Sequence, residues 1–181
     1  MRRILLVIAG VIAAVALAAT AAFASSPHFK HGGEPVCTIS GSSTSKSTTC
    51  TASLAGLGNA DVVVRTSVNG FAVYQCQNQG SNTAPGQNKV LVGPATSTTS
   101  IPASQIKNGN LTFTTNPAVL TAAATVSGAA AGCPNSNWTG VNPVLTVTDI
   151  TLAIEQPPGT VIFTCTASNS AGLSGRVALT C

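Results

Sequence analysis

Charged side chains are scarce in this chain, where they make up 7% of 181 residues. The whole sequence has a formal net charge of +4, and half of that excess comes from Arg2 and Arg3. Beyond residue 24, six basic and four acidic side chains remain, scattered along the chain. Because binding to a phosphate backbone requires basic residues gathered in a patch or stripe, we expect no nucleic-acid partner.

Histidines and paired acids are also lacking. His28 and His31 are the only histidines, so a Ser-His-Asp triad would have to recruit this N-terminal segment. The four acidic side chains are Glu34, Asp61, Asp149 and Glu155. Their spacing does not suggest the carboxylate pair of a glycosidase. The sequence therefore predicts a protein that is not an enzyme and that uses no cofactor.

A metal site is not expected either. The sequence has no C-x-x-C pair, and closely spaced cysteine pairs are typical of zinc sites. The spacing His28-x-x-His31-x-x-Glu34 could hold a metal loosely, but a solvated segment is the simpler interpretation of these residues. We therefore predict a protein without a bound metal.

What the chain does have at its start is a long apolar run. Two arginines follow Met1, the run extends over about residues 4–21, and Ala22-Phe23-Ala24 has the A-x-A form of a cleavage site. This pattern predicts a signal peptide over residues 1–24 and a secreted protein without membrane contact after cleavage. The alternative is an uncleaved anchor, because the run is long enough to cross a bilayer.

Six cysteines follow this segment, at Cys37, Cys50, Cys76, Cys133, Cys165 and Cys181. An even number of cysteines in an exported chain predicts disulfides. The first two and the last two flank hairpin-like loops, which favours Cys37–Cys50 and Cys165–Cys181 and leaves Cys76–Cys133 to close the longest loop. An immunoglobulin-style bridge such as Cys50–Cys165 is the alternative.

The body of the chain has the pattern of an all-β protein. From Val36 onward, short β-branched runs alternate with Gly, Asn, Ser and Pro. We predict a single antiparallel, immunoglobulin-like β-sandwich domain over residues 36–181, stapled by disulfides. A flexible N-terminal arm over residues 25–35 would precede it. Residues 120–131, which are rich in alanine, are the one segment that could be helical.

Asn69-Gly70 is the clearest turn signal in the sequence. It separates two β-branched runs, residues 62–68 and 71–76, and both of its residues tolerate the positive φ of a type I′ turn. These features predict a tight hairpin. Its register would place Arg65 opposite Tyr74 on the outward face, as a cross-strand pair.

A second hairpin is predicted near the end of the chain. Residues 143–155 and 160–167 would form its strands, joined around Pro157-Pro158-Gly159. In the first strand the apolar positions change parity near Asp149, which indicates a β-bulge or a bend. We therefore expect Asp149 to serve the backbone of the bulge and to have no chemical role.

Two amide-rich loops, residues 75–88 and 133–140, are the strongest candidate for a binding surface. A Cys76–Cys133 bond would bring them side by side. Their candidate binding residues are Gln77, Asn78, Asn82, Asn135, Asn137 and Trp138. An aromatic plate surrounded by amide donors and acceptors suits a neutral sugar. The alternative is that Trp138, the only tryptophan, fills the core.

Parts of these loops resemble small exported proteins of high-GC Gram-positive bacteria. The resemblance is carried by residues 70–78, 84–88 and 133–138, and the arginine pair and alanine-rich start fit it. It implies a β-sandwich and secretion. Because that group has no assigned activity, the resemblance implies no site residues.

Together these features predict a secreted, non-enzymatic extracellular or cell-surface protein with a structural or binding role. The sequence does not identify its partner; the candidates are a cell-wall or matrix polysaccharide and another surface protein. A neutral-glycan-binding module that uses the two loops is the first alternative. A secreted protease inhibitor is the second, although residues 77–88 offer no apolar or basic anchor for a protease.

Overall fold

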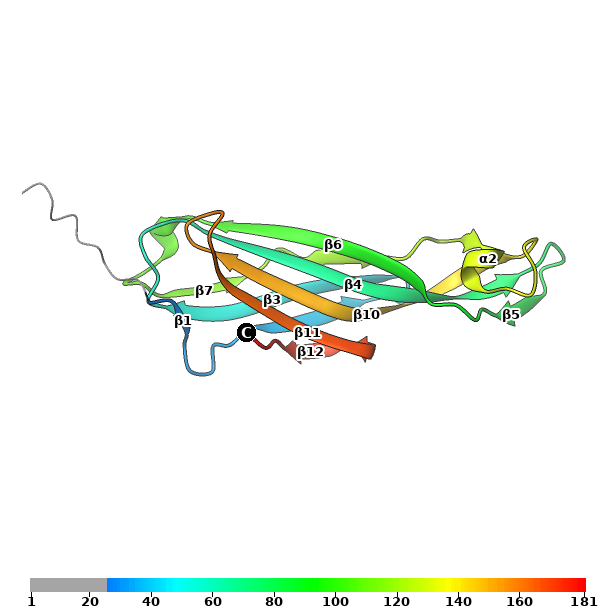
Figure 1. The fold of residues 1–181 in the computed structure, drawn as a ribbon, viewed down its shortest axis with the longest axis horizontal. Coiled ribbons are helices and arrows are strands. Elements are labelled where there is room, and N and C mark those ends of the chain that lie inside the picture. The colour runs from blue at the N-terminus through cyan, green and yellow to red at the C-terminus, as the bar shows by residue number, and fades with distance from the viewer. Residues whose placement is uncertain (1–25) are drawn as a thin grey trace, which may run out of the picture.

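The structure is a computed structural model that describes residues 26–181. The predicted signal peptide over residues 1–24, together with Ser25, lies outside this part of the chain. The described residues form two six-stranded antiparallel sheets packed together, which confirms an all-β sandwich. The molecule is elongated, and its long strands run roughly along the long axis (Figure 1).

Sheet A is built around strand β3. This strand pairs with β2 and β1, and also with β7 and β8, while β12 pairs with β2. The strands of sheet A are β1 (His28–Phe29), β2 (Val36–Gly41), β3 (Ser45–Ala55), β7 (Leu111–Thr114), β8 (Ala118–Thr121) and β12 (Gly175–Ala178).

Sheet B is built around strands β4 and β10, which pair with each other. Strands β5 and β6 also pair with β4, and β9 and β11 also pair with β10. The strands of sheet B are β4 (Val62–Gln77), β5 (Thr83–Pro85), β6 (Val90–Ile101), β9 (Val126–Ser127), β10 (Thr139–Glu155) and β11 (Val161–Leu173).

Within residues 26–181, helical structure is confined to two short segments, η1 (Ala103–Gln105) and α2 (Gly128–Ala131). The alanine-rich residues 120–131 therefore begin in strand β8 and end in a single turn of helix. Among residues 26–181, no helix is long and apolar enough to span a membrane.

The core lies between the sheets and is filled by alternate residues of each strand. In β4 the even-numbered residues face inward, and Val62, Val64 and Val68 are fully buried. Leu54 and Leu120 of sheet A are buried in the same core. The period of two that marks a half-buried strand is thus maintained along β4 from Val64 onward, while Val63, on the outer face, is buried as well.

The predicted hairpin at Asn69-Gly70 is wrong, because β4 runs through these residues without a turn. Each neighbouring strand contains one extra residue at this level: Thr148 in β10, and one residue of the pair Gly93-Pro94 in β6. The irregularity thus belongs to the neighbours, and β4 stays extended. Gly70 is required there because a Cβ would collide with the carbonyl oxygen of Thr146.

The predicted pairing of Arg65 with Tyr74 fails for the same reason. Arg65 donates from Nε to Glu155 Oε1 at 2.7 Å across the sheet. Tyr74 faces the core and is buried, and its hydroxyl donates to the carbonyl oxygen of Ala123 at 2.9 Å. Without a turn, the odd and even positions of β4 keep their faces, so Arg65 and Tyr74 lie on opposite sides of the sheet.

The second predicted hairpin is confirmed. Strands β10 and β11 pair in antiparallel register, with Leu152 opposite Cys165. The predicted bulge is also present, as a register shift between Val147 and Asp149. The carboxylate of Asp149 accepts hydrogen bonds from the Thr148 and Ser168 hydroxyls, both at 2.6 Å.

The segment expected to be a flexible arm lies against the domain over residues 26–35. Strand β1 pairs with β3, and the backbone N–H of Lys30 donates to Ser53 O at 2.9 Å. The ring of Phe29 lies 4.5 Å from that of Phe163 in sheet B, measured between centroids. The difference has a physical reason, since an apolar ring and several backbone hydrogen bonds stabilise this short segment.

Three disulfides join the pairs that the cysteine spacing predicts. Cys37–Cys50 connects facing residues of β2 and β3, so it lies within sheet A. Cys76–Cys133 connects β4 to the segment after α2, and Cys165–Cys181 connects β11 to the C-terminal residue. The alternative Cys50–Cys165 bridge is not formed. An immunoglobulin-like strand order stays a prediction.

Candidate functional site

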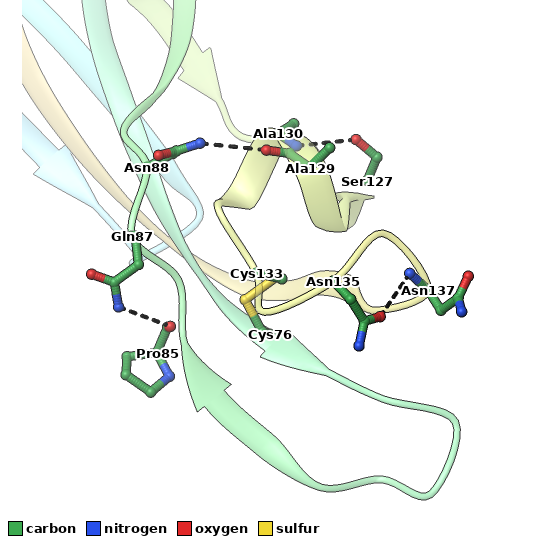
Figure 2. Close-up of a disulfide and its surroundings, with 10 residues drawn as sticks. All are labelled: Cys76, Pro85, Gln87, Asn88, Ser127, Ala129, Ala130, Cys133, Asn135 and Asn137. Atoms are coloured by element: carbon green, nitrogen blue, oxygen red, sulfur yellow. Dashed lines mark hydrogen bonds between the residues drawn. A yellow bond between two sulfur atoms is a disulfide. The ribbon is translucent and has the colours of Figure 1, made fainter.

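The two amide-rich loops meet at one end of the molecule. Residues 78–82, which join β4 to β5, and residues 133–138, which follow α2, make up what we call the tip. The Cys76–Cys133 disulfide holds the two segments together, with a Cα–Cα distance of 5.6 Å (Figure 2). The tip lies at the end of the long axis opposite to β1 (Figure 1).

The first tip segment is held by its own asparagines. The backbone N–H of Asn78 donates to Asn82 O at 3.1 Å, and the N–H of Asn82 donates to Asn78 Oδ1 at 2.9 Å. Ser81 adopts a positive φ of 61° between them. The Asn78 side chain therefore substitutes for a backbone acceptor and closes a tight loop.

The second tip segment is anchored by α2. The N–H of Cys133 donates to Gly128 O at 2.8 Å, and Ser127 Oγ accepts the N–H of Ala130 at the start of the helix. Further along, the N–H of Asn137 donates to Asn135 Oδ1 at 3.0 Å (Figure 2). Side-chain oxygens again replace backbone partners, as in an Asx turn.

Both segments open onto one hollow of about 240 Å³. Its lining residues are Asn78, Gln79, Gly80, Asn135, Asn137 and Trp138. Trp138 is half-buried, packs against the core and is one of the residues that line the hollow. Trp138 is therefore neither fully buried in the core nor fully exposed.

Four of the candidate residues named from the sequence are therefore brought together, and two are not. Gln77 lies in β4 opposite Thr139, and Asn82 closes the loop through its backbone. The structure adds Gln79 and Gly80 to the hollow. Sequence reasoning missed these two because the turn at Ser81 decides which loop residues line the hollow.

The hollow has an uncharged, hydrogen-bonding character. Its six lining residues include no acid, base or nucleophile. The Oδ1 atoms of Asn78 and Asn135 are engaged by backbone N–H groups, which orients the Nδ2 groups of the same amides as donors. The arrangement can bind a polar, uncharged molecule beside an aromatic ring, and it contains no group suited to acid–base catalysis.

The acidic side chains with shifted pKa values lie on β10, outside the tip. The Gly159 N–H and then the Arg65 guanidinium lower the pKa of the Glu155 carboxyl by hydrogen bonding. The hydroxyls of Ser168 and Thr148 lower the pKa of Asp149. Both carboxylates bind the backbone or side chains of turns and bulges, so their shifts have a structural cause.

The candidate metal ligands do not form a site. Residues 26–181 contain no group of three or more His, Cys, Asp or Glu side chains that could hold a metal ion. Instead, His28 Nδ1 lies 2.9 Å from Ser26 O, and His31 belongs to the turn after β1.

Comparison with known proteins does not assign this chain to a family. No family model, no curated protein and no solved structure matches it. The resemblance to exported proteins of high-GC Gram-positive bacteria therefore stays a prediction, and the function has to be argued from the geometry.

Proposed function

We propose that this protein is a non-enzymatic extracellular binding protein whose tip binds an uncharged glycan. One observation carries the proposal: a half-buried tryptophan shares a hollow with amide side chains from two loops that a disulfide joins. The three disulfides fit an oxidising, extracellular environment, where such glycans are found.

The chemistry of the hollow supports an uncharged sugar. The indole ring of Trp138 offers an apolar face, against which the C–H face of a sugar ring can pack. The amides of Asn78, Asn135 and Asn137 can pair with sugar hydroxyls, since an amide both donates and accepts. A charged ligand would find no opposite charge among these lining residues.

The construction of the tip supports binding with little reorganisation. The disulfide and the backbone hydrogen bonds of both segments restrict the loops before a ligand arrives. Restricting a loop in its binding conformation lowers the entropy lost on association. The preferred partner is a cell-wall or matrix polysaccharide, whose repeated units can meet a small hollow at the end of an elongated molecule.

The protein provides its own probe for the test, because Trp138 is its only tryptophan. We expect tryptophan fluorescence to change on titration with oligosaccharides of a neutral cell-wall or matrix glycan. In Trp138→Ala, affinity measured by calorimetry should fall about tenfold or more. Phe71→Ala is the matched control, since Phe71 is a half-exposed aromatic residue on the outer face of sheet B.

Two results would contradict the proposal. One is a Trp138→Ala variant that binds as tightly as the original protein. The other is the absence of binding across a panel of neutral glycans. Release of reducing ends from a bound glycan would overturn the non-enzymatic part of the proposal.

A further inference from the structure

Hydroxyl groups predominate on the outer face of sheet A. In β3 the inward positions include the buried Cys50, Ala52 and Leu54. Five of the six outward positions of this strand are serine or threonine, namely Ser45, Ser47, Thr49, Thr51 and Ser53, and the sixth is Ala55. Since alternate residues of a strand lie about 7 Å apart, β3 presents a regular row of hydroxyls.

The neighbouring strands extend this row sideways. Opposite the outward residues of β3, the register places five exposed hydroxyl side chains, Thr38, Ser40, Thr112, Thr114 and Thr121, and two apolar ones, Val36 and Val119. Neighbouring strands lie about 4.8 Å apart, so the hydroxyls form a two-dimensional array. We call this surface, made of these hydroxyl residues and those of the β3 row, the hydroxyl face.

These hydroxyls keep hydrogen-bonding capacity for a ligand. Ser53 Oγ and Thr112 Oγ1 bond each other at 2.9 Å, and Ser45 Oγ and Thr121 Oγ1 do so at 3.1 Å. A hydroxyl has one donor and two acceptor positions. Each member of these pairs therefore retains at least one position that can face outward.

A shallow groove lies at one end of the hydroxyl face. Thr51, Ser53 and Thr112 form part of its lining, with Glu34 and Arg176 also contributing, and its volume is about 150 Å³. Both charged side chains are exposed, and the one ion pair within residues 26–181 joins two other residues. The groove thus offers a carboxylate acceptor and a guanidinium donor beside neutral hydroxyls.

We propose that the hydroxyl face binds an uncharged, polyhydroxylated chain, a neutral polysaccharide laid along β3 with one unit in the groove. An apolar partner would displace water from the covered hydroxyls and leave their remaining donor and acceptor positions unsatisfied, at a cost for each one. The groove has one charge of each sign, so it favours neither a polyanion nor a polycation. An uncharged ligand rich in hydroxyls can form hydrogen bonds with the face and carries no net charge.

This surface is distinct from the tip. The hydroxyl face belongs to the strands of sheet A, whereas the tip is formed by loops that adjoin β4, β5 and β10 of sheet B. The inference therefore goes beyond the proposed function and does not depend on Trp138. Two surfaces for one class of ligand would let a single molecule bind a polysaccharide at two places.

The test compares two matched triple variants of the disulfide-bonded protein. Thr38→Val, Thr49→Val and Thr51→Val remove hydroxyls from the hydroxyl face and keep the β-branched shape. The control changes Thr96, Thr98 and Thr164 to Val on the outer face of sheet B. Binding is measured by co-sedimentation with cellulose, chitin and starch granules.

We expect the original protein to bind at least one of the three solids. The sheet A variant should bind it about tenfold more weakly, because several hydrogen bonds are lost together, and the sheet B control should bind it unchanged. A Thr49→Lys, Thr51→Lys variant, which places bulk and charge on the face, should show the same loss. Thermal unfolding of each variant checks that it is folded.

Three results would overturn the proposal: no binding to any solid, equal binding by the sheet A variants, or equal losses in the sheet A and sheet B variants. The Trp138→Ala variant distinguishes failure of the hydroxyl-face proposal from failure of the proposed binding site at the tip. If Trp138→Ala abolishes binding while the sheet A variants bind normally, the hydroxyl face is excluded and the tip is upheld. The reverse pattern upholds the hydroxyl face and excludes the tip.

Discussion

Gly70 shows how a single residue permits the central strand of sheet B to pass between two bulged neighbours. Its Cα faces the Thr146 carbonyl so closely that any side chain would force the two strands apart. We expect Gly70→Ala to lower the free energy of unfolding by about 2 kcal/mol, the cost typical of overpacking in a core. Chemical denaturation followed by circular dichroism measures this change.

The control for that substitution is Gly80→Ala in the tip. A Cβ at Gly80 would meet only the side-chain ends of Asn78 and Asn82, at 3.4 and 3.5 Å. The stability of this variant should stay close to that of the original protein. If Gly80→Ala proves as destabilising as Gly70→Ala, the close approach of Thr146 is not the cause.

Glu155 connects the stability of the β10–β11 turn to pH. Its carboxylate accepts the Gly159 N–H at 2.8 Å and the Arg65 Nε–H, and these bonds lower its pKa from the ordinary value of 4.5. A carboxyl with a lowered pKa in the folded state stabilises the fold at pH values above 4.5. That contribution is lost as the pH falls through the lowered pKa.

We therefore expect Glu155→Gln to lower the melting temperature at neutral pH and to reduce the loss of stability below pH 4.5. Thermal unfolding between neutral and acidic pH measures both effects. Glu34→Gln is the control, because Glu34 is exposed and makes no ion pair within residues 26–181. An unchanged pH profile in Glu155→Gln would contradict the role assigned to this carboxylate.

At the scale of elements, the disulfides differ in the length of chain that they close. Cys76–Cys133 spans 57 positions and Cys37–Cys50 spans 13. The chain-entropy relation gives about 4 kcal/mol for the first and about 3 kcal/mol for the second. We expect the double variant Cys76→Ser, Cys133→Ser to be less stable in chemical denaturation than the double variant Cys37→Ser, Cys50→Ser.

Tryptophan fluorescence adds a local measurement to that comparison. Trp138 lies five residues after Cys133 along the chain and lines the hollow that the disulfide holds in place. Its emission in the folded state should change when Cys76–Cys133 is removed and stay the same when Cys37–Cys50 is removed. An equal change in both variants would show that the tip does not depend on its own disulfide.

The two predicted hairpins show what local sequence can and cannot determine about elements. The β10–β11 hairpin was predicted because Pro157-Pro158-Gly159 interrupts two strands and the parity change near Asp149 lies within one of them. At Asn69-Gly70 the turn signal was the clearest in the sequence, but β4 continues through these residues without a turn. The extra residues at this level lie in β6 and β10, outside the segment that carries the turn signal.

At the scale of the whole molecule, polar contacts connect the two sheets at both sides. On one side, Thr166 of β11 and Thr180 exchange two backbone hydrogen bonds, of 2.8 and 2.9 Å. On the other side, Asn116 donates from Nδ2 to Thr98 O and from its backbone N–H to Thr99 Oγ1, in β6. These contacts occupy part of the outer edges of β11 and β6, and this limits the pairing of either edge with a strand of another chain.

Only part of the candidate site could be predicted from the sequence. The amide-rich composition of both loops and the Cys76–Cys133 bond could be read from the sequence, so Asn78, Asn135, Asn137 and Trp138 were named together. That Gln79 lines the hollow depends on the turn at Ser81, and the half-buried position of Trp138 depends on packing against a core built from strands throughout the domain.

The sequence by itself determined the all-β class, the two local disulfides and the second hairpin, because each depends on short spacings or on periodicity. The remaining two cysteines then predicted the Cys76–Cys133 bond and the approach of the two amide-rich loops. Only the tertiary structure decided that β4 is continuous, that Trp138 lines a hollow, and that the hydroxyls of β3 join those of its neighbours in one array. These features follow from the register between strands. Register is set by the packing of the whole sandwich, which no single segment of the chain specifies.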